Sequence, residues 1–180
     1  AEQHAVQQAA LQGVAGGAAE RAHRAGQVFH DLGHLRDLVR HGATVTVYEA
    51  LHVLGGVLQY GIPSFRLPRD IINLEVQRLK DMGVCFEINK VIGRTFTLAD
   101  LTGKMGYDAV FVAAGAGAPT FLGIPGEYAG QVYSANEFLT RVNLMGGDQF
   151  PYRGTPISFG TSVAVIGASE TPNSIGITLV

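Results

Sequence analysis

The sequence predicts an α/β fold in which helices flank a parallel sheet. Short apolar runs typical of buried strands alternate with amphipathic helical stretches, which is the pattern of strand–helix–strand units. Two of these runs, residues 107–113 and 163–166, lead into glycines, and ligands of parallel sheets gather where the strands end. Periodicity alone does not separate nucleotide-binding folds from other α/β folds.

Composition narrows the class of protein further. The chain has 180 residues, 47% of them apolar, and a formal net charge of −2, so it offers no electrostatic footprint for nucleic acid or an anionic membrane. A single cysteine excludes an internal disulfide framework and a four-thiolate cluster. No apolar window predicts a transmembrane helix and no secretory signal is visible, so we expect a cytoplasmic protein.

The first 33 residues have a biased composition, with nine Ala, five Gln and five Gly. Val6, Leu11 and Val14 form only a weak helical stripe, and two glycines interrupt it. We expect a loosely ordered helix or a tail here, without a buried strand.

A helix and a strand open the predicted fold. Apolar residues recur at helical spacing over residues 35–39, and Gly42 is placed to end that helix. Residues 44–48 predict a strand, which Glu49 follows directly. A glycine-rich bend over residues 54–57 comes next.

A second helix is predicted over residues 70–82. Pro68 is tolerated in a first helical turn and can open this helix, and Gly83 closes it. The apolar residues on or near its packed face are Ile71, Leu74 and Leu79.

The strand predicted over residues 84–88 contains the one cysteine, Cys85, which is most simply a core residue. Residues 91–92 extend this strand or start another. Thr97 is a candidate N-cap for a short helix that ends near Thr102.

The last part of the chain contains two predicted strands and a helix. Residues 107–113 form a near-continuous apolar run, typical of a strand buried on both faces. Ser134 is placed to cap a helix over residues 135–144. Residues 163–166 predict a second strand of the buried type, followed by Gly167.

Glu49 is the first candidate site residue. In dinucleotide-binding folds, an acid at the end of the second strand accepts hydrogen bonds from ribose hydroxyls, about 20 residues after a glycine-rich turn. That spacing places the turn near residues 26–31, where only Gly26 fits the pattern. The alternative for Glu49 is a solvated acid at the end of a strand.

Three glycine clusters are further candidates. Gly55 and Gly56 permit positive φ and a close approach of backbone to a ligand, or they form an ordinary turn. The small residues 113–117 either let a pyrophosphate or flavin pack against backbone or form a tight turn. A second dinucleotide turn could begin at residues 167–169, although Ser169 stands where a glycine is expected.

The chain contains no pattern that specifies a metal site. Its six histidines are scattered between residues 4 and 52, and His30 and His34 at i, i+4 favour a helix surface. Glu127 and Asp148 lie in predicted loops without a recognisable catalytic partner.

Several motifs together resemble a known family. They are residues 45–50 (VTVYEA), 55–68 (GGVLQYGIPSFRLP), 110–117 (VFVAAGAG), 123–127 (GIPGE), 133–141 (YSANEFLTR) and 163–167 (VAVIG). They are similar to the small (β) subunit of glutamate synthase and its relatives. Those relatives include the large subunit of NADH-dependent ferredoxin:NADP oxidoreductase and the flavin segment of dihydropyrimidine dehydrogenase. The resemblance covers about three quarters of the chain.

The resemblance implies a Rossmann-like FAD/NAD(P)-binding fold that is incomplete at both ends. Residues 34–160 would be part of an FAD-binding domain, residues 161–180 the start of an NAD(P)-binding domain, and residues 1–33 an atypical N-terminal segment. The divergent ends suggest truncation, an altered reading frame or an error of sequence assignment.

The family implies an oxidoreductase that passes electrons from NAD(P)H through FAD to iron–sulfur clusters. The clusters would lie in a partner or a missing region, and the partner would resemble the glutamate synthase large subunit, in a hetero-oligomer. No catalytic side chain is expected for the hydride step.

The resemblance also assigns cofactor-binding roles to individual residues. Glu49 would hold the FAD ribose, Arg66 would contact FAD, and Val91 or Ile92 would face the adenine. The remaining residues implied are Ala50, Gly55, Gly56 and Val57 along the flavin nucleotide, Ala114 and Gly115 closing on the cofactor, and Gly167, Ala168 and Ser169 in the NAD(P) turn.

Two alternatives compete with this interpretation. A non-catalytic remnant or assembly subunit would keep the α/β scaffold, and a chain lacking half its domain would expose apolar surface for association. A disulfide reductase with two dinucleotide sites is disfavoured because Cys85 has no partner thiol.

Overall fold

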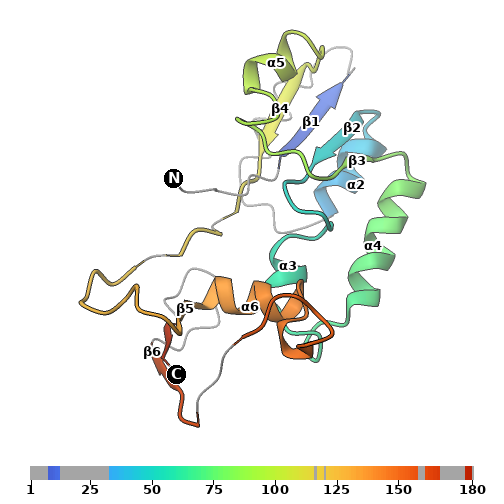
Figure 1. The fold of residues 1–180 in the computed structure, drawn as a ribbon. Helices are drawn as coiled ribbons and strands as arrows, with labels where there is room; N and C mark the ends of the chain where they lie inside the picture. The colour runs from blue at the N-terminus through green and yellow to red at the C-terminus, as the bar shows by residue number, and fades with distance from the viewer. Residues whose placement is uncertain are drawn as a thin grey trace. The chain divides into compact units, whose positions relative to one another are not determined.

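The computed structural model describes residues 8–12, 33–115, 117–119, 121–157, 161–166 and 177–179 (Figure 1). It divides the chain into two compact units. Unit 1 comprises Ala1–Gly55 and Asp70–Gly115, and unit 2 comprises Gly56–Arg69 and Ala116–Val180.

A four-stranded sheet of order β3-β2-β1-β4 forms the centre of unit 1 (Figure 1). Its strands are β1 (Gln8–Gln12), β2 (Thr44–Tyr48), β3 (Cys85–Glu87) and β4 (Ala109–Val112). β2 and β3 are parallel, whereas β1 is antiparallel to both β2 and β4. β2, β3 and β4 therefore run in the same direction. The α/β class is confirmed, but the sheet is mixed rather than wholly parallel.

The strand β1 corrects the prediction of a helix or tail in the first 33 residues. Gln8–Gln12 pairs with β2 on one side and β4 on the other. The local sequence did not indicate a strand, because these residues carry no strong β pattern. The pairing comes from the unfilled backbone donors and acceptors of the two neighbouring strands. The glycine turn expected near residues 26–31 lies outside the described residues.

The order 3-2-1-4 also occurs in a doubly wound nucleotide-binding sheet of order 3-2-1-4-5-6, in which the strands are parallel. Here β1 is reversed, since Gln8 pairs with Tyr48 and Gln12 pairs with Thr44. The carboxyl end of β1 therefore lies at the edge of the sheet opposite to the end of β2.

Three helices of the chain pack on or connect these strands. They are α2 (Gly33–Arg40), α4 (Arg69–Asp81) and α5 (Leu98–Thr102). Gly42 ends α2 as predicted: its φ is +86°, and the N–H of Ala43 donates to the carbonyl of Leu38 at 3.1 Å. Thr97 caps α5 as predicted, because its side chain accepts the N–H of Asp100.

Both faces of the sheet are covered, because successive β2 side chains point to opposite faces. On one face, α2 and α4 pack over the first cluster. Its buried members are Ala43, Val45, Val47, Leu79 and Val84. On the other face, the segment between β3 and β4 packs over the second cluster, whose buried members are Tyr48, Ile92 and Leu101.

Three details of packing in unit 1 differ from the prediction. In α4, Ile71 and Leu74 are each 52% exposed. The helix instead buries Ile72, Val76 and Leu79, which share one face at i, i+4 and i+7 spacing.

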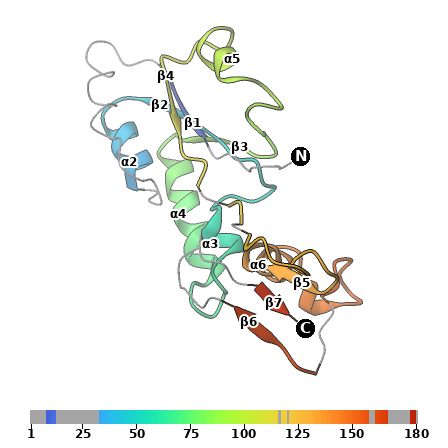
Figure 2. The same ribbon diagram turned by 90° about the vertical axis from the view of Figure 1, so that its left-hand side faces the viewer.

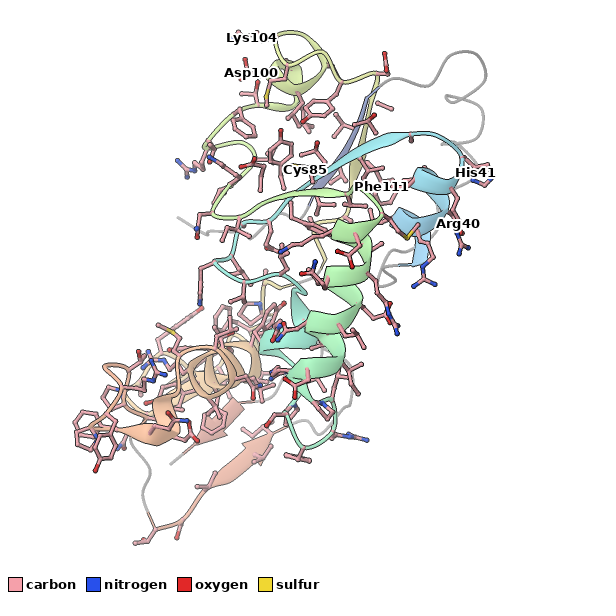
Figure 3. The ribbon with its side chains drawn as sticks, turned by 90° about the vertical axis from the view of Figure 1, so that its right-hand side faces the viewer. Arg40, His41, Cys85, Asp100, Lys104 and Phe111 are labelled. Atoms are coloured by element: carbon pink, nitrogen blue, oxygen red, sulfur yellow. The ribbon has the colours of Figure 1, made fainter. Side chains whose placement is uncertain are left out.

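Cys85 is exposed rather than a core residue. It lies on the edge strand β3 (Figure 3), where alternation turns Val84 and Phe86 toward the first cluster and Cys85 away from it. β4 is only half-buried, and its last residue, Val112, is exposed. β4 nevertheless packs on both faces, with Phe111 against the first cluster and Val110 against the second, so only the depth of burial is smaller than predicted.

Unit 2 combines short helices with a three-stranded antiparallel sheet of order β5-β7-β6 (Figure 2). Its elements are α3 (Val57–Tyr60), β5 (Val132–Ser134), α6 (Ala135–Asn143), the 3₁₀ helix η1 (Gly147–Gln149), β6 (Ala164–Ile166) and β7 (Ile177–Leu179). Ser134 caps α6 as predicted, accepting the N–H of Glu137 at 3.1 Å. The prediction of a buried strand at β6 is wrong, because all three of its residues are exposed.

Within the described part of the chain, no helix has both the length and the apolar character needed to cross a membrane.

Candidate functional site

The carboxyl ends of β2, β3 and β4 meet at one edge of the unit 1 sheet. The register of β1 establishes this for two of them, because Gln8 pairs with both Tyr48 and Val112. Glu49, which follows Tyr48, and residues 113–115, which follow Val112, therefore begin at the same edge of the sheet. This carboxyl edge is where ligands of such sheets bind.

Glu49 is buried at this carboxyl edge, with only 2% of its surface exposed. Its backbone N–H donates to the carbonyl of Glu87 at 2.9 Å, which extends the pairing of β2 with β3. Its Oε1 accepts the N–H of Leu51 at 3.0 Å. Its Oε2 is buried and has no hydrogen-bond partner among the described residues.

Burial raises the pKa of the Glu49 carboxyl, and the backbone N–H groups of Leu51 and Ala50 oppose that shift. A buried acceptor without a donor costs about 1–3 kcal/mol. A ligand hydroxyl that donates to Oε2 would remove this cost. The residue thus fits the ribose role, because a sugar supplies hydroxyl donors.

The loop after β3 is bound to the residues around Glu49. The N–H of Lys90 donates to the carbonyl of Glu49 at 2.9 Å, and the N–H of Asn89 donates to the carbonyl of Leu51 at 3.1 Å. Asn89 adopts a positive φ of 57°, a conformation that asparagine tolerates better than most residues. These bonds bring Val91 to the carboxyl edge.

Val91 and Ile92, the two candidates for the adenine contact, differ in their surroundings. Ile92 is buried in the second cluster with Tyr48 and Leu101. Val91 is half-buried, and its backbone N–H donates to Thr95 Oγ1 at 3.0 Å. Val91 has the more open side chain of the two.

Ala114 and Gly115 follow β4 at the carboxyl edge. Gly115 has a φ of +66° and is exposed, and a Cβ added to it would meet no atom within 4 Å. The backbone here leaves room for a ligand. Ala50 and Gly55, both partly buried, follow Glu49 along the chain in the same unit.

The other predicted contacts with FAD belong to unit 2. Gly56 has φ 49° and ψ −127° and begins α3, where its carbonyl accepts the N–H groups of Gln59 and Tyr60. Val57 is the first residue of α3 and is half-buried. Arg66 has an exposed side chain, and its backbone N–H donates to the carbonyl of Pro63. Gly167, Ala168 and Ser169 lie outside the described residues.

Sequence reasoning named Glu127 only as a loop residue without a catalytic partner and missed Arg69 and Asn143, and all three organise unit 2. Glu127 is buried, and its two carboxylate oxygens accept the N–H groups of Leu122 and Gly123. Arg69 and Asn143 donate to carbonyl groups of the α3 segment. A charged residue directly after the GIPG turn was the one sequence signal for Glu127. Nothing local indicated the roles of Arg69 and Asn143.

Within the part of the chain that the structure describes, no three or more His, Cys, Asp or Glu side chains gather in a group that could hold a metal ion.

Comparison with known proteins gives a consistent set of relatives, although no family model matches the chain. The NADP(+)-dependent formate dehydrogenase subunit beta of Moorella thermoacetica is 39% identical over 136 residues, which are 74% of this chain and 18% of that protein. A protein named as a glutamate synthase (NADPH) small chain from Cereibacter sphaeroides is 36% identical over 135 residues, 74% of this chain and 32% of that protein.

A third relative is the PreT subunit of the NAD-dependent dihydropyrimidine dehydrogenase of Salmonella typhimurium. It is 34% identical over 142 residues, 77% of this chain and 31% of that protein. The chain thus spans less than a third of the length of these relatives. The names of all three relatives describe subunits of oxidoreductases. The names also give the nicotinamide cofactor, which is NADP(+), NADPH and NAD respectively. Over its matched residues, the chain is similar to subunits of NAD(P)-dependent oxidoreductases, among them the glutamate synthase small chain.

Proposed function

We propose that this chain is the FAD-binding part of an NAD(P)H-dependent oxidoreductase subunit. The observation that carries the proposal is the buried Glu49 carboxylate at the end of β2, with Oε2 lacking a donor among the described residues. When bound, FAD would accept a hydride from NAD(P)H and release electrons one at a time.

The chain's own residues would bind and orient this cofactor. Glu49 would accept hydrogen bonds from the ribose of the adenosine half, and the half-buried Val91 would lie against the adenine. The open backbone at Gly115 would allow the cofactor to approach β4 closely. In unit 2, Gly56 and Val57 would line the flavin nucleotide through backbone. Arg66, Ala50, Gly55 and Ala114 keep the roles that the family resemblance assigns to them, and Ile92, buried in the second cluster, is the alternative to Val91.

The assignment of domains and partners is part of the same proposal. Residues 34–160 would belong to the FAD-binding domain, and residues 161–180 would begin the NAD(P)-binding domain, with Gly167, Ala168 and Ser169 in its first turn. The relatives are subunits of larger enzymes. This supports a hetero-oligomer in which iron–sulfur clusters of a partner of the glutamate synthase large-subunit type receive the electrons.

The experiment is to purify the full chain, incubate it with FAD, remove free cofactor, and record the visible spectrum. The flavin is then released by denaturation and identified by mass. We expect about one FAD per chain, with a flavin absorbance band. The same chain carrying Glu49→Gln should bind FAD at least tenfold more weakly, because hydrogen bonds to charged groups contribute about 1.5–3 kcal/mol.

A chain that binds no flavin even in excess FAD would contradict this proposal. The exposed apolar residues of unit 2, among them Phe121, Ile124 and Val165, would then favour the alternative function of an assembly subunit. Self-association or co-purification of a stoichiometric partner, measured by light scattering, would support that alternative.

A further inference from the structure

The short helix α3 depends on side chains from other elements. A four-residue helix (Val57–Tyr60) is far below the length at which a helix is stable by itself, and its terminal carbonyl groups need partners. Three carbonyls of residues 57–62, which we call the α3 segment, accept hydrogen bonds from side chains outside it. Arg69 Nη1 donates to Leu58 O at 2.6 Å, and Arg69 Nη2 donates to Ile62 O at 2.8 Å. Asn143 Nδ2 donates to Tyr60 O at 2.7 Å.

Arg69 lies at the start of α4, and Asn143 lies at the end of α6. The two residues thus hold the α3 segment from two different helices of the chain. Both donors and all three carbonyls belong to unit 2, whereas the rest of α4 belongs to unit 1. We call this arrangement, Arg69 and Asn143 on the carbonyls of Leu58, Tyr60 and Ile62, the carbonyl clamp.

The guanidinium of Arg69 holds the two carbonyls of Leu58 and Ile62. Among the residues that the structure describes, no carboxylate forms an ion pair with it, and burial lowers its pKa. Its planar fork places two N–H donors on carbonyls four residues apart, a geometry that the single ammonium of lysine does not reproduce.

The α3 segment follows Gly56, whose backbone conformation is one that few residues other than glycine adopt. Gly56 has φ 49° and ψ −127°, which is accessible to glycine and strained for other residues. Gln59, in the middle of the helix, is buried. Without external donors, the few internal bonds of α3 would not hold Gly56 and Val57 in one arrangement.

We propose that Arg69 and Asn143 are positioning residues that fix the Gly56–Val57 backbone for flavin binding. This inference rests on the proposed function, in which these two residues line the flavin nucleotide. Neither Arg69 nor Asn143 contacts the cofactor in this proposal. They set its affinity by keeping the turn in its binding conformation before the cofactor arrives.

The first test needs no flavin. Amide hydrogen exchange of the full chain reports the opening of α3 through the N–H groups of Gln59, Tyr60 and Gly61, which donate within the segment. In Arg69→Met we expect these amides to exchange about tenfold faster or more, since two hydrogen bonds from a charged group are lost. Arg69→Lys should show an intermediate increase, and Asn143→Ala a smaller one.

The matched control is Arg78→Met. Arg78 lies on the same helix α4 but pairs with Glu75 at the surface, so this substitution removes an equal side chain and should leave exchange in α3 unchanged. Unchanged exchange of these three amides in both Arg69→Met and Asn143→Ala would overturn the clamp, whether or not the chain binds flavin.

The second test measures FAD affinity by flavin fluorescence in the same variants. We expect the dissociation constant to rise about tenfold in Arg69→Met, less in Arg69→Lys, and not at all in Arg78→Met. Faster exchange with unchanged FAD affinity would overturn the positioning role and leave the proposed function intact. Absence of FAD binding by the unsubstituted chain would instead contradict the proposed function, while the exchange experiment still decides whether the clamp exists.

Discussion

Two buried glutamates, one in each unit, are held in opposite ways. Glu127 in unit 2 is 6% exposed, and both of its oxygens accept backbone N–H groups of its own loop, from Leu122 and from Gly123 at 2.8 Å. Glu49 in unit 1 is 2% exposed, but only Oε1 has a donor among the described residues. Burial therefore does not distinguish the two carboxylates, whereas hydrogen bonding does.

The difference separates a carboxylate that organises its own loop from one that needs a further partner. Glu127 stabilises the turn around Gly123 and Gly126, both of which have positive φ. Glu49 lies where three strands end and raises the energy of the folded chain until a donor arrives. A buried polar atom without a partner is rare in folded proteins, and its position at the carboxyl edge connects it with ligand binding.

A substitution of Glu127 is expected to have the largest effect and tests whether the two glutamates differ in their contribution to stability. Replacing it by alanine leaves the N–H groups of Leu122 and Gly123 without their acceptor, so we expect a loss of about 3 kcal/mol in the free energy of unfolding. Urea unfolding of the full chain measures this. Glu49→Gln, measured alongside, should cost less than 1 kcal/mol because it removes a buried charge while keeping an acceptor for Leu51. Equal losses would refute the distinction between the two sites.

The pH dependence of the free energy of unfolding tests the environment of Glu49. Its pKa is raised from an ordinary value of 4.5 by burial, so the folded chain binds this proton more tightly than the unfolded chain. The stability linked to Glu49 is therefore fully present below pH 4.5 and is lost as the pH rises through the folded pKa.

In chain free of flavin, the unfolding free energy of Glu49→Gln relative to the unsubstituted chain should therefore increase between pH 4 and pH 8. Urea titrations across this range test the sign. A relative stability that falls with rising pH would mean that Glu49 is stabilised as the carboxylate, contrary to its environment in the structure.

A substitution away from the carboxyl edge tests whether FAD affinity depends on that edge or on the overall stability of unit 1. Thr97 caps α5, which leads into the amino end of β4, and its hydroxyl accepts the N–H of Asp100 at 3.2 Å. Thr97→Ala should lower the free energy of unfolding by about 1 kcal/mol. FAD affinity should not change, and a large change would show that affinity follows global stability rather than the carboxyl edge.

Elements with local signals were predictable from the sequence. Alternation predicted β2, the glycine at position 42 predicted the end of α2, and hydroxyl caps predicted the starts of α5 and α6. These features depend on residues within one turn or one strand, so the tertiary structure has little room to override them.

Features decided by distant contacts were not predictable. The strand β1 exists through pairing with both β2 and β4, and its own residues do not indicate it. In α4 two apolar stripes compete, and the sheet decides that Ile72 and Val76 are buried while Ile71 and Leu74 are exposed.

The candidate site likewise has one part that the sequence predicts and another that only the folded chain shows. The position of Glu49 at the end of a strand follows from the sequence, and its unpartnered oxygen emerges only in the folded chain. The carbonyl clamp joins residues 83 positions apart in the case of Tyr60 and Asn143, a separation that no local pattern reports.

The central claim is that Glu49 binds the ribose of the adenosine half of FAD. The most direct measurement compares the affinities of FAD and FMN, which lacks that half, for the unsubstituted chain and for Glu49→Gln. The account predicts that the substitution weakens FAD binding at least tenfold, as expected for loss of a hydrogen bond to a charged group, and leaves FMN binding unchanged. Equal weakening of both cofactors, or no weakening of FAD, would contradict it.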